Sequence, residues 1–154
     1  MRDFNEANRK KKIARIRIQE NPGNLSMDVL SQLEKTVKAS LKDGYILCPV
    51  AWKIAEEANV PKVAIGEITD RLGIRITNCQ IGCFKIEKTP YNNSGHKNID
   101  GEIITMLKTL KENNQLTCAK VFDVARQFKL KPMVIANEAN VRDLKIRSCQ
   151  LGCF

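Results

Sequence analysis

The chain has 154 residues, of which 43% are hydrophobic and 28% charged, and this balance is ordinary for a soluble globular protein. No apolar run approaches the roughly 18 residues that a membrane span needs, and the start of the chain has no apolar secretory segment before its basic cluster. We therefore expect a cytoplasmic protein with no membrane partner.

The net charge of +9 is unevenly distributed. Residues 1–20 hold seven basic and three acidic side chains, residues 21–84 hold seven of each, and residues 85–154 hold twelve basic and seven acidic. This pattern favours a polyanionic partner, nucleic acid first, although a positive surface can also simply keep a protein soluble.

Residues 1–24 have the character of a basic N-terminal arm. Arg9-Lys10-Lys11-Lys12 is followed by alternating apolar and basic residues and then by the breaker Asn21-Pro22-Gly23-Asn24. Two interpretations stay open for this segment: a terminus without fixed structure, or an arm that reaches a partner.

The remainder is a tandem duplication with an offset of seventy residues. The first unit spans residues 25–84 and the second residues 97–154, with a linker at 85–96 that contains the single histidine, His96. The copies align without insertion, and each ends in Cys-Gln-(Ile/Leu)-Gly-Cys-Phe. Identical pairs elsewhere include Cys48 and Cys118, Ala55 and Ala125, Ile65 and Ile135, and Ile76 and Ile146.

Each unit is predicted to contain three helices and a short strand. The first helix follows the N-cap Ser26 in the first copy, and the second begins near Cys48 or after the N-cap Thr117. The third helix starts with proline in its first turn, at Pro61 or Pro132. Alternating apolar residues then predict strands at 74–77 and 144–147.

The middle of each unit resembles the helix-turn-helix of DNA-binding proteins. Ala55 supplies the small residue where two helices cross, Asn59 tolerates a left-handed turn, and Val60, Ile65 and Ile68 suit the buried face of the second helix. The second copy keeps this pattern at Ala125, Leu130 and Ile135, but Lys129 replaces the turn asparagine and Glu138 replaces Ile68.

With the following strand, each unit is similar to a winged-helix variant of that superfamily. The resemblance implies a mainly α fold of two tandem trihelical units that bind double-stranded DNA, with recognition helices beginning at Pro61 and Pro132. The first would present Lys62, Glu67, Asp70 and Arg71, whose mixed charges suit phosphates poorly. The second would present Lys131, Asn137, Asn140 and Arg142, and asparagine is a natural partner of adenine.

The candidate nucleic-acid contacts therefore come from the arm and both recognition helices, with more weight on the second copy. They are Arg9, Lys10, Lys11, Lys12, Lys62, Arg71, Lys129, Lys131, Asn137, Asn140 and Arg142.

The six cysteines leave three interpretations open. Their spacing in the closing motifs places three residues between two thiols, where a zinc knuckle has two. They are interpreted first as small buried side chains around a glycine turn, with Phe84 and Phe154 filling the core. A zinc or iron-sulfur site and a redox switch are the alternatives. The candidate ligands are Cys48, Cys79, Cys83, Cys118, Cys149 and Cys153.

No enzyme is predicted, because the sequence shows no glycine-rich phosphate loop, no paired-carboxylate motif, and one histidine only. The expected function is DNA binding by a transcriptional regulator without a cofactor. The alternative is a protein-interaction or assembly adaptor, with a protein partner or a homo-oligomer, built from the same units.

Overall fold

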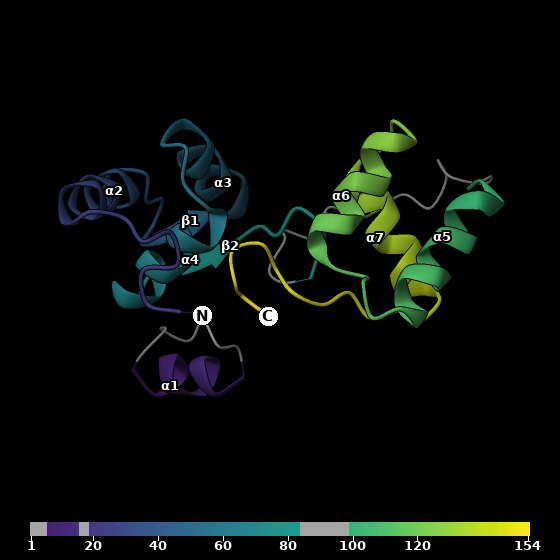
Figure 1. Ribbon diagram of the computed structural model, residues 1–154, viewed down its shortest axis with the longest axis horizontal. Coiled ribbons are helices and arrows are strands. Elements are labelled where there is room, and N and C mark those ends of the chain that lie inside the picture. Colours follow the sequence, from purple (N-terminus) through teal and green to yellow (C-terminus); the bar gives the residue numbers. More distant parts are fainter. Residues whose placement is uncertain (1–5, 16–18, 84–98) are drawn as a thin grey trace. The chain divides into compact units, whose positions relative to one another are not determined.

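The computed structural model describes residues 6–15, 19–83 and 99–154, which form seven helices and one two-stranded sheet. The chain divides into two compact units (Figure 1). Unit 1 comprises residues 1–79 together with 149–154, and unit 2 comprises residues 80–148. The predicted linker at 85–96, as well as Phe84, lies outside the described residues.

Unit 1 contains four helices and both strands. They are α1 (Glu6–Arg15), α2 (Met27–Ala39), β1 (Tyr45–Leu47), α3 (Cys48–Glu57), α4 (Lys62–Arg71) and β2 (Arg75–Thr77). Helices α2, α3 and α4 pack against one another beside the sheet (Figure 1). The three-helix order predicted for the first copy is confirmed, and the basic cluster of the predicted arm forms helix α1.

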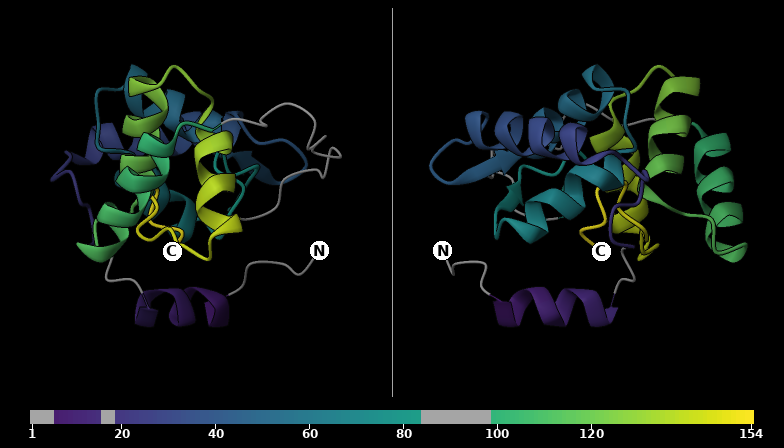
Figure 2. Two further views of the ribbon diagram at one scale, coloured as in Figure 1. Left: turned by 90° about the vertical axis from the view of Figure 1, so that its right-hand side faces the viewer. Right: turned by 60° about the vertical axis from the view of Figure 1, so that its left-hand side comes forward.

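Unit 2 repeats the helical order with α5 (Gly101–Glu112), α6 (Cys118–Gln127) and α7 (Pro132–Val141). Helix α7 packs against both α5 and α6, and the three helices stay together in every view (Figure 2). The protein is therefore mainly helical, as predicted.

Local sequence explains where the helices begin. The Ser26 hydroxyl accepts a hydrogen bond from the backbone N–H of Val29, and the Thr117 hydroxyl accepts one from Lys120, so both predicted N-caps are confirmed. Pro49 lies in the first turn of α3, where its missing N–H removes no helical bond. Pro61 differs from the prediction because it is the N-cap of α4, one residue before the helix.

The short strands pair in a way that the sequence does not predict. Strand β2 is confirmed, and it runs parallel to β1, with Ile46 opposite Ile76. In the second copy the strand predicted at 144–147 is wrong, because these residues make only an isolated parallel bridge between Thr117 and Arg147. No antiparallel wing is formed by the described strands.

The cores of the two units use equivalent positions. Leu33, Val37, Ile65 and Ile68 are buried in unit 1. The counterparts of the first three, Ile103, Leu107 and Ile135, are buried in unit 2, whereas Glu138 stands at the position of Ile68. The duplicated apolar pattern is therefore the pattern of the two cores.

The closing motifs do not follow the repeat. Cys149–Phe154, from the second copy, belongs to unit 1, whereas Gln80–Cys83 of the first copy belongs to unit 2. Within unit 1, the carbonyl of Leu151 lies against Gly66 of α4, where an added Cβ would be 1.8 Å from that oxygen. The Leu151 side chain is fully buried. Unit 1 is thus completed by the last six residues of the chain.

Candidate nucleic-acid interface and thiol cluster

The turn between the two helices of each motif has the predicted geometry. Asn59 has a φ of 53°, in the left-handed region, and the N–H of Val60 donates to the carbonyl of Ala55 at 2.9 Å. Lys129 has a φ of 54°, and the N–H of Leu130 donates to Ala125 at 2.9 Å. Lysine in place of asparagine therefore leaves the turn unchanged in backbone shape.

Two cations of the first predicted recognition helix, α4, are engaged within the protein. Lys62 lies 3.4 Å from a carboxylate oxygen of Glu56, and its Nζ stands 4.5 Å from the centre of the Trp52 ring. Arg71 pairs with Glu34 of α2 at 2.5 Å. Their predicted role in contacting DNA phosphates is weakened, because each cation would first have to leave its partner within the protein.

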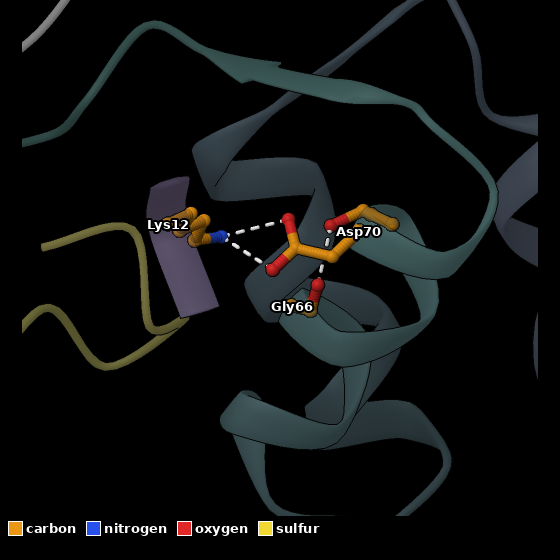
Figure 3. A network of polar contacts seen from close by, with 4 residues as sticks. Lys12, Gly66 and Asp70 are labelled. Atoms are coloured by element: carbon orange, nitrogen blue, oxygen red, sulfur yellow. Dashed lines mark hydrogen bonds and ion pairs between the residues drawn. The ribbon is translucent and has the colours of Figure 1, made fainter. Parts of the chain in front are cut away.

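Asp70 corrects the sequence-based interpretation most clearly. It was expected on the outer face of α4, but its side chain is only 13% exposed and both carboxylate oxygens accept from Lys12 Nζ, at 2.7 and 2.6 Å (Figure 3). The Lys12 side chain is only 14% exposed. Lys12 therefore joins α1 to α4, and it would have to leave Asp70 to make the nucleic-acid contact predicted for it.

The other basic residues of α1 differ from Lys12. Lys10 and Lys11 are exposed, and Lys10 makes a solvent-exposed pair with Glu6 at 3.3 Å. Such a pair contributes little and is easily exchanged for a phosphate. The Arg9 side chain lies outside what the structure describes.

The corresponding surface of unit 2 keeps more of its predicted residues accessible. Lys129, Lys131 and Asn140 are exposed and Asn137 is half-buried. None of the salt bridges formed between described residues involves Lys129 or Lys131. The accessible polar groups therefore cluster on the turn before α7 and along α7 itself.

Arg142 is the exception among the predicted contacts in unit 2. Its guanidinium pairs with the Glu138 carboxylate one turn earlier and also donates to the Glu138 carbonyl, at 3.2 Å. Glu138 stands at the position of the buried Ile68 of the first copy, and it forms a partly buried ion pair with Arg142. Arg142 is therefore a weaker candidate for a DNA contact than the two lysines.

The cysteines occupy different environments. Cys48, Cys79 and Cys118 are buried, Cys83 is exposed, and Cys149 and Cys153 are half-buried. Cys48, Cys79, Cys149 and Cys153 all belong to unit 1. Among the described residues, no group of three or more histidine, cysteine or acidic side chains is placed to hold a metal ion. The interpretation as core residues fits the three buried thiols.

Cys149 and Cys153 interact directly. A hydrogen bond from Cys153 lowers the pKa of the Cys149 thiol to about 7, and backbone groups of Cys153 and Leu151 act in the same direction against burial and the nearby Cys79. The pKa of Cys153 is raised by the same hydrogen bond, by burial and by the charge of Cys149, although Lys12 opposes the rise. At neutral pH one sulfur of the pair is partly ionised and the other keeps its proton.

Sequence reasoning missed two contacts of this site. The Lys12–Asp70 ion pair joins residues 58 positions apart. The approach of Leu151 to Gly66 joins residues still further apart, and its one local signal is a glycine inside a helical pattern.

No protein-family model matches the chain, and no curated protein or solved structure matches it. Across the described segments, every helix is too short or too polar to cross a membrane. The functional assignment therefore depends on the residues themselves.

Proposed function

We propose that the chain binds double-stranded DNA through unit 2, as a transcriptional regulator of helix-turn-helix type. The observation that carries the proposal is the set of accessible polar groups on one helix and the turn before it: Lys129, Lys131, Asn137 and Asn140. The left-handed turn at Lys129 and the small contact residue Ala125, 1% exposed, support the motif.

The lysines fit a phosphate-binding role for the start of α7. Lys131 is the N-cap residue of this helix, and Lys129 lies two residues earlier on the turn. A helix N-terminus attracts anions through its backbone N–H groups and dipole, and two exposed ammonium groups strengthen that attraction. Neither lysine would have to break a salt bridge to a described residue before contacting a phosphate.

The remaining residues fit contacts to base edges. Asn137, Asn140 and Val141 are three and four positions apart on α7, so they share one face of the helix. An asparagine can donate to and accept from adenine, and an aliphatic side chain can contact the methyl group of thymine. Val141 is 72% exposed, so it is available for such a contact. These side chains favour a site that contains A·T pairs.

Gel-shift titration against genomic fragments tests this function. We expect binding at about 50 mM salt that weakens steeply as salt rises, because phosphate contacts release counterions. Lys129→Gln and Lys131→Gln should weaken binding to all sequences and each lower the salt slope by about 1, whereas Asn140→Ala should cost about 1 to 3 kcal/mol on the preferred site and relax its sequence preference.

Lys62→Gln is the matched control, because Lys62 already faces Glu56 and Trp52. It should change DNA affinity much less than Lys131→Gln. An absence of binding at about 50 mM salt would overturn the proposed function. If Lys62→Gln and Lys131→Gln lower the DNA affinity equally, α7 is not the main DNA-binding surface.

The second candidate is a protein-interaction adaptor, and unit 1 favours it. Three charged side chains of α4 form ion pairs with Glu56, Glu34 and Lys12. These pairs reduce the positive charge that the helix could offer to a polyanion. A chain that fails to shift DNA but sediments as a stable dimer or co-purifies in a stoichiometric complex would support the adaptor.

A further inference from the structure

The last six residues form a turn that brings two thiols together. Gly152 has a φ of 70°, in the left-handed region, and its N–H donates to the carbonyl of Cys149 at 2.9 Å. The N–H of Cys149 donates to the carbonyl of Phe154, also at 2.9 Å. These two backbone bonds fold the segment so that the Cys153 thiol donates a hydrogen bond to the Cys149 sulfur.

The charged and ionisable groups around the pair make the two sulfurs unequal. Cys79 acts electrostatically on Cys149, and Cys48 and Lys12 act on Cys153, while Lys12 is itself paired with Asp70. The hydrogen bond from Cys153 stabilises the Cys149 thiolate and lowers its pKa to about 7, whereas Cys153 remains protonated. One sulfur is therefore a nucleophile at neutral pH and the other a proton donor beside it.

We propose that Cys149 and Cys153 are a peroxide-reactive pair that closes a reversible disulfide within the last turn of the chain. The Cys149 thiolate attacks one oxygen of hydrogen peroxide, so an S–O bond forms, the O–O bond breaks, and the departing hydroxide takes up a proton to become water. Sulfur is oxidised by two electrons and the peroxide is reduced by two. The product at Cys149 is a sulfenic acid.

The second step uses the neighbouring thiol. The Cys153 sulfur attacks the Cys149 sulfur, the S–O bond breaks, and the hydroxyl leaves with the Cys153 proton as a second water molecule. Two thiols and one peroxide thus give one disulfide and two waters. A dithiol reductant reverses the change by thiol–disulfide exchange.

The proposal is specific to this turn. In the first copy the equivalent cysteines have different environments, since Cys79 is 3% exposed and Cys83 is exposed. Leu151, between the reactive cysteines, is the residue that lies against Gly66 of α4. A disulfide would therefore constrain the segment that completes unit 1.

Peptide mapping of the full-length protein tests the pair. The protein is treated with equimolar hydrogen peroxide, free thiols are blocked by alkylation, and the digest is analysed without reduction. We expect the C-terminal peptide to lose about 2 Da, to resist alkylation at both cysteines, and to regain both hydrogens after dithiothreitol. The rate should fall about tenfold per pH unit well below the Cys149 pKa of about 7.

Two variants give the controls. Cys83→Ser removes an exposed thiol outside the pair and should leave the disulfide unchanged. Cys153→Ser should leave a sulfenic acid on Cys149 that dimedone captures. The proposal fails if the wild-type C-terminal peptide is alkylated at both cysteines after peroxide, if Cys149 goes to a sulfinic acid while Cys153 stays free, or if Cys149 pairs with Cys79 instead. These three outcomes are read from the wild-type chain, so the test remains valid even if a variant folds poorly.

Discussion

At the scale of single residues, the Lys12–Asp70 ion pair is the most deeply buried of the salt bridges between described residues. Both side chains are about seven-eighths buried, so each has given up most of its hydration and depends on the other for compensation (Figure 3). The net contribution of the pair to the free energy of unfolding is small, because the cost of removing both charges from water offsets much of their attraction. Removing one partner is nevertheless costly, since the other charge remains in a poorly hydrated position.

Lys12→Ala should destabilise unit 1 by about 1.5 to 3 kcal/mol, the range for a lost hydrogen bond to a charged group. Urea unfolding followed by Trp52 fluorescence measures this, because Trp52 is the single tryptophan of the chain and lies in α3. Lys10→Ala is the control in the same helix, as its pair with Glu6 is about three-quarters exposed, and should stay within about 0.5 kcal/mol of wild type. Equal midpoints for the two variants would show that α1 is not held by Lys12.

At the scale of the elements, α4 is shaped by the close approach of another backbone. Gly66 lies in the middle of the helix, where alanine would normally be better by about 1 kcal/mol. Its lack of a Cβ leaves room for the Leu151 carbonyl, and the buried Thr69 hydroxyl donates to the Gly66 carbonyl at 2.8 Å. The second copy has Ala136 at the equivalent position of α7. The glycine is thus explained by packing and not by helix propensity.

Gly66→Ala should therefore destabilise unit 1, by about 1 to 3 kcal/mol, because the added Cβ would meet backbone atoms of Leu151 and not a flexible side chain. Gly101→Ala is the matched control. Gly101 begins α5, and a Cβ there would meet nothing within 4 Å. The thermal unfolding midpoint should fall for Gly66→Ala, whereas for Gly101→Ala it should rise or stay unchanged. A Gly66→Ala variant as stable as wild type would mean that the closing segment moves aside at little cost.

The elements also show what the sequence could predict. Helix positions and caps followed from local patterns, as at Ser26 and Thr117, because capping and amphipathic periodicity involve residues only a few positions apart. Strand β1 was missed because three residues, Tyr45–Leu47, carry too little alternation, and its parallel partner lies thirty positions away. Asp70 was placed on the outside because its partner Lys12 lies 58 positions away, in a segment for which both a terminus without fixed structure and a partner-binding arm had been left open.

At the scale of the whole molecule, the repeat in sequence and the grouping in space differ at the closing motifs. Unit 1 takes its last segment from the end of the second copy, residues 149–154. Within that segment Leu151 is fully buried, which corresponds to about 1.5 to 3 kcal/mol of burial for one leucine side chain. The stability of unit 1 therefore depends on residues at the far end of the chain, and a division at the repeat boundary would remove them.

Truncation after Ser148 should consequently lower the unfolding midpoint reported by Trp52, although Trp52 lies in the first copy. Leu151→Ala in the full chain should reproduce the effect, at about 2 to 5 kcal/mol, because it leaves a cavity as well as losing apolar contact. Leu151→Met keeps the volume and should cost less than about 1.5 kcal/mol. If truncation leaves the Trp52 transition unchanged, the last six residues contribute nothing to unit 1. If alanine and methionine cost the same, the loss comes from the backbone contact with Gly66 and not from the buried side chain.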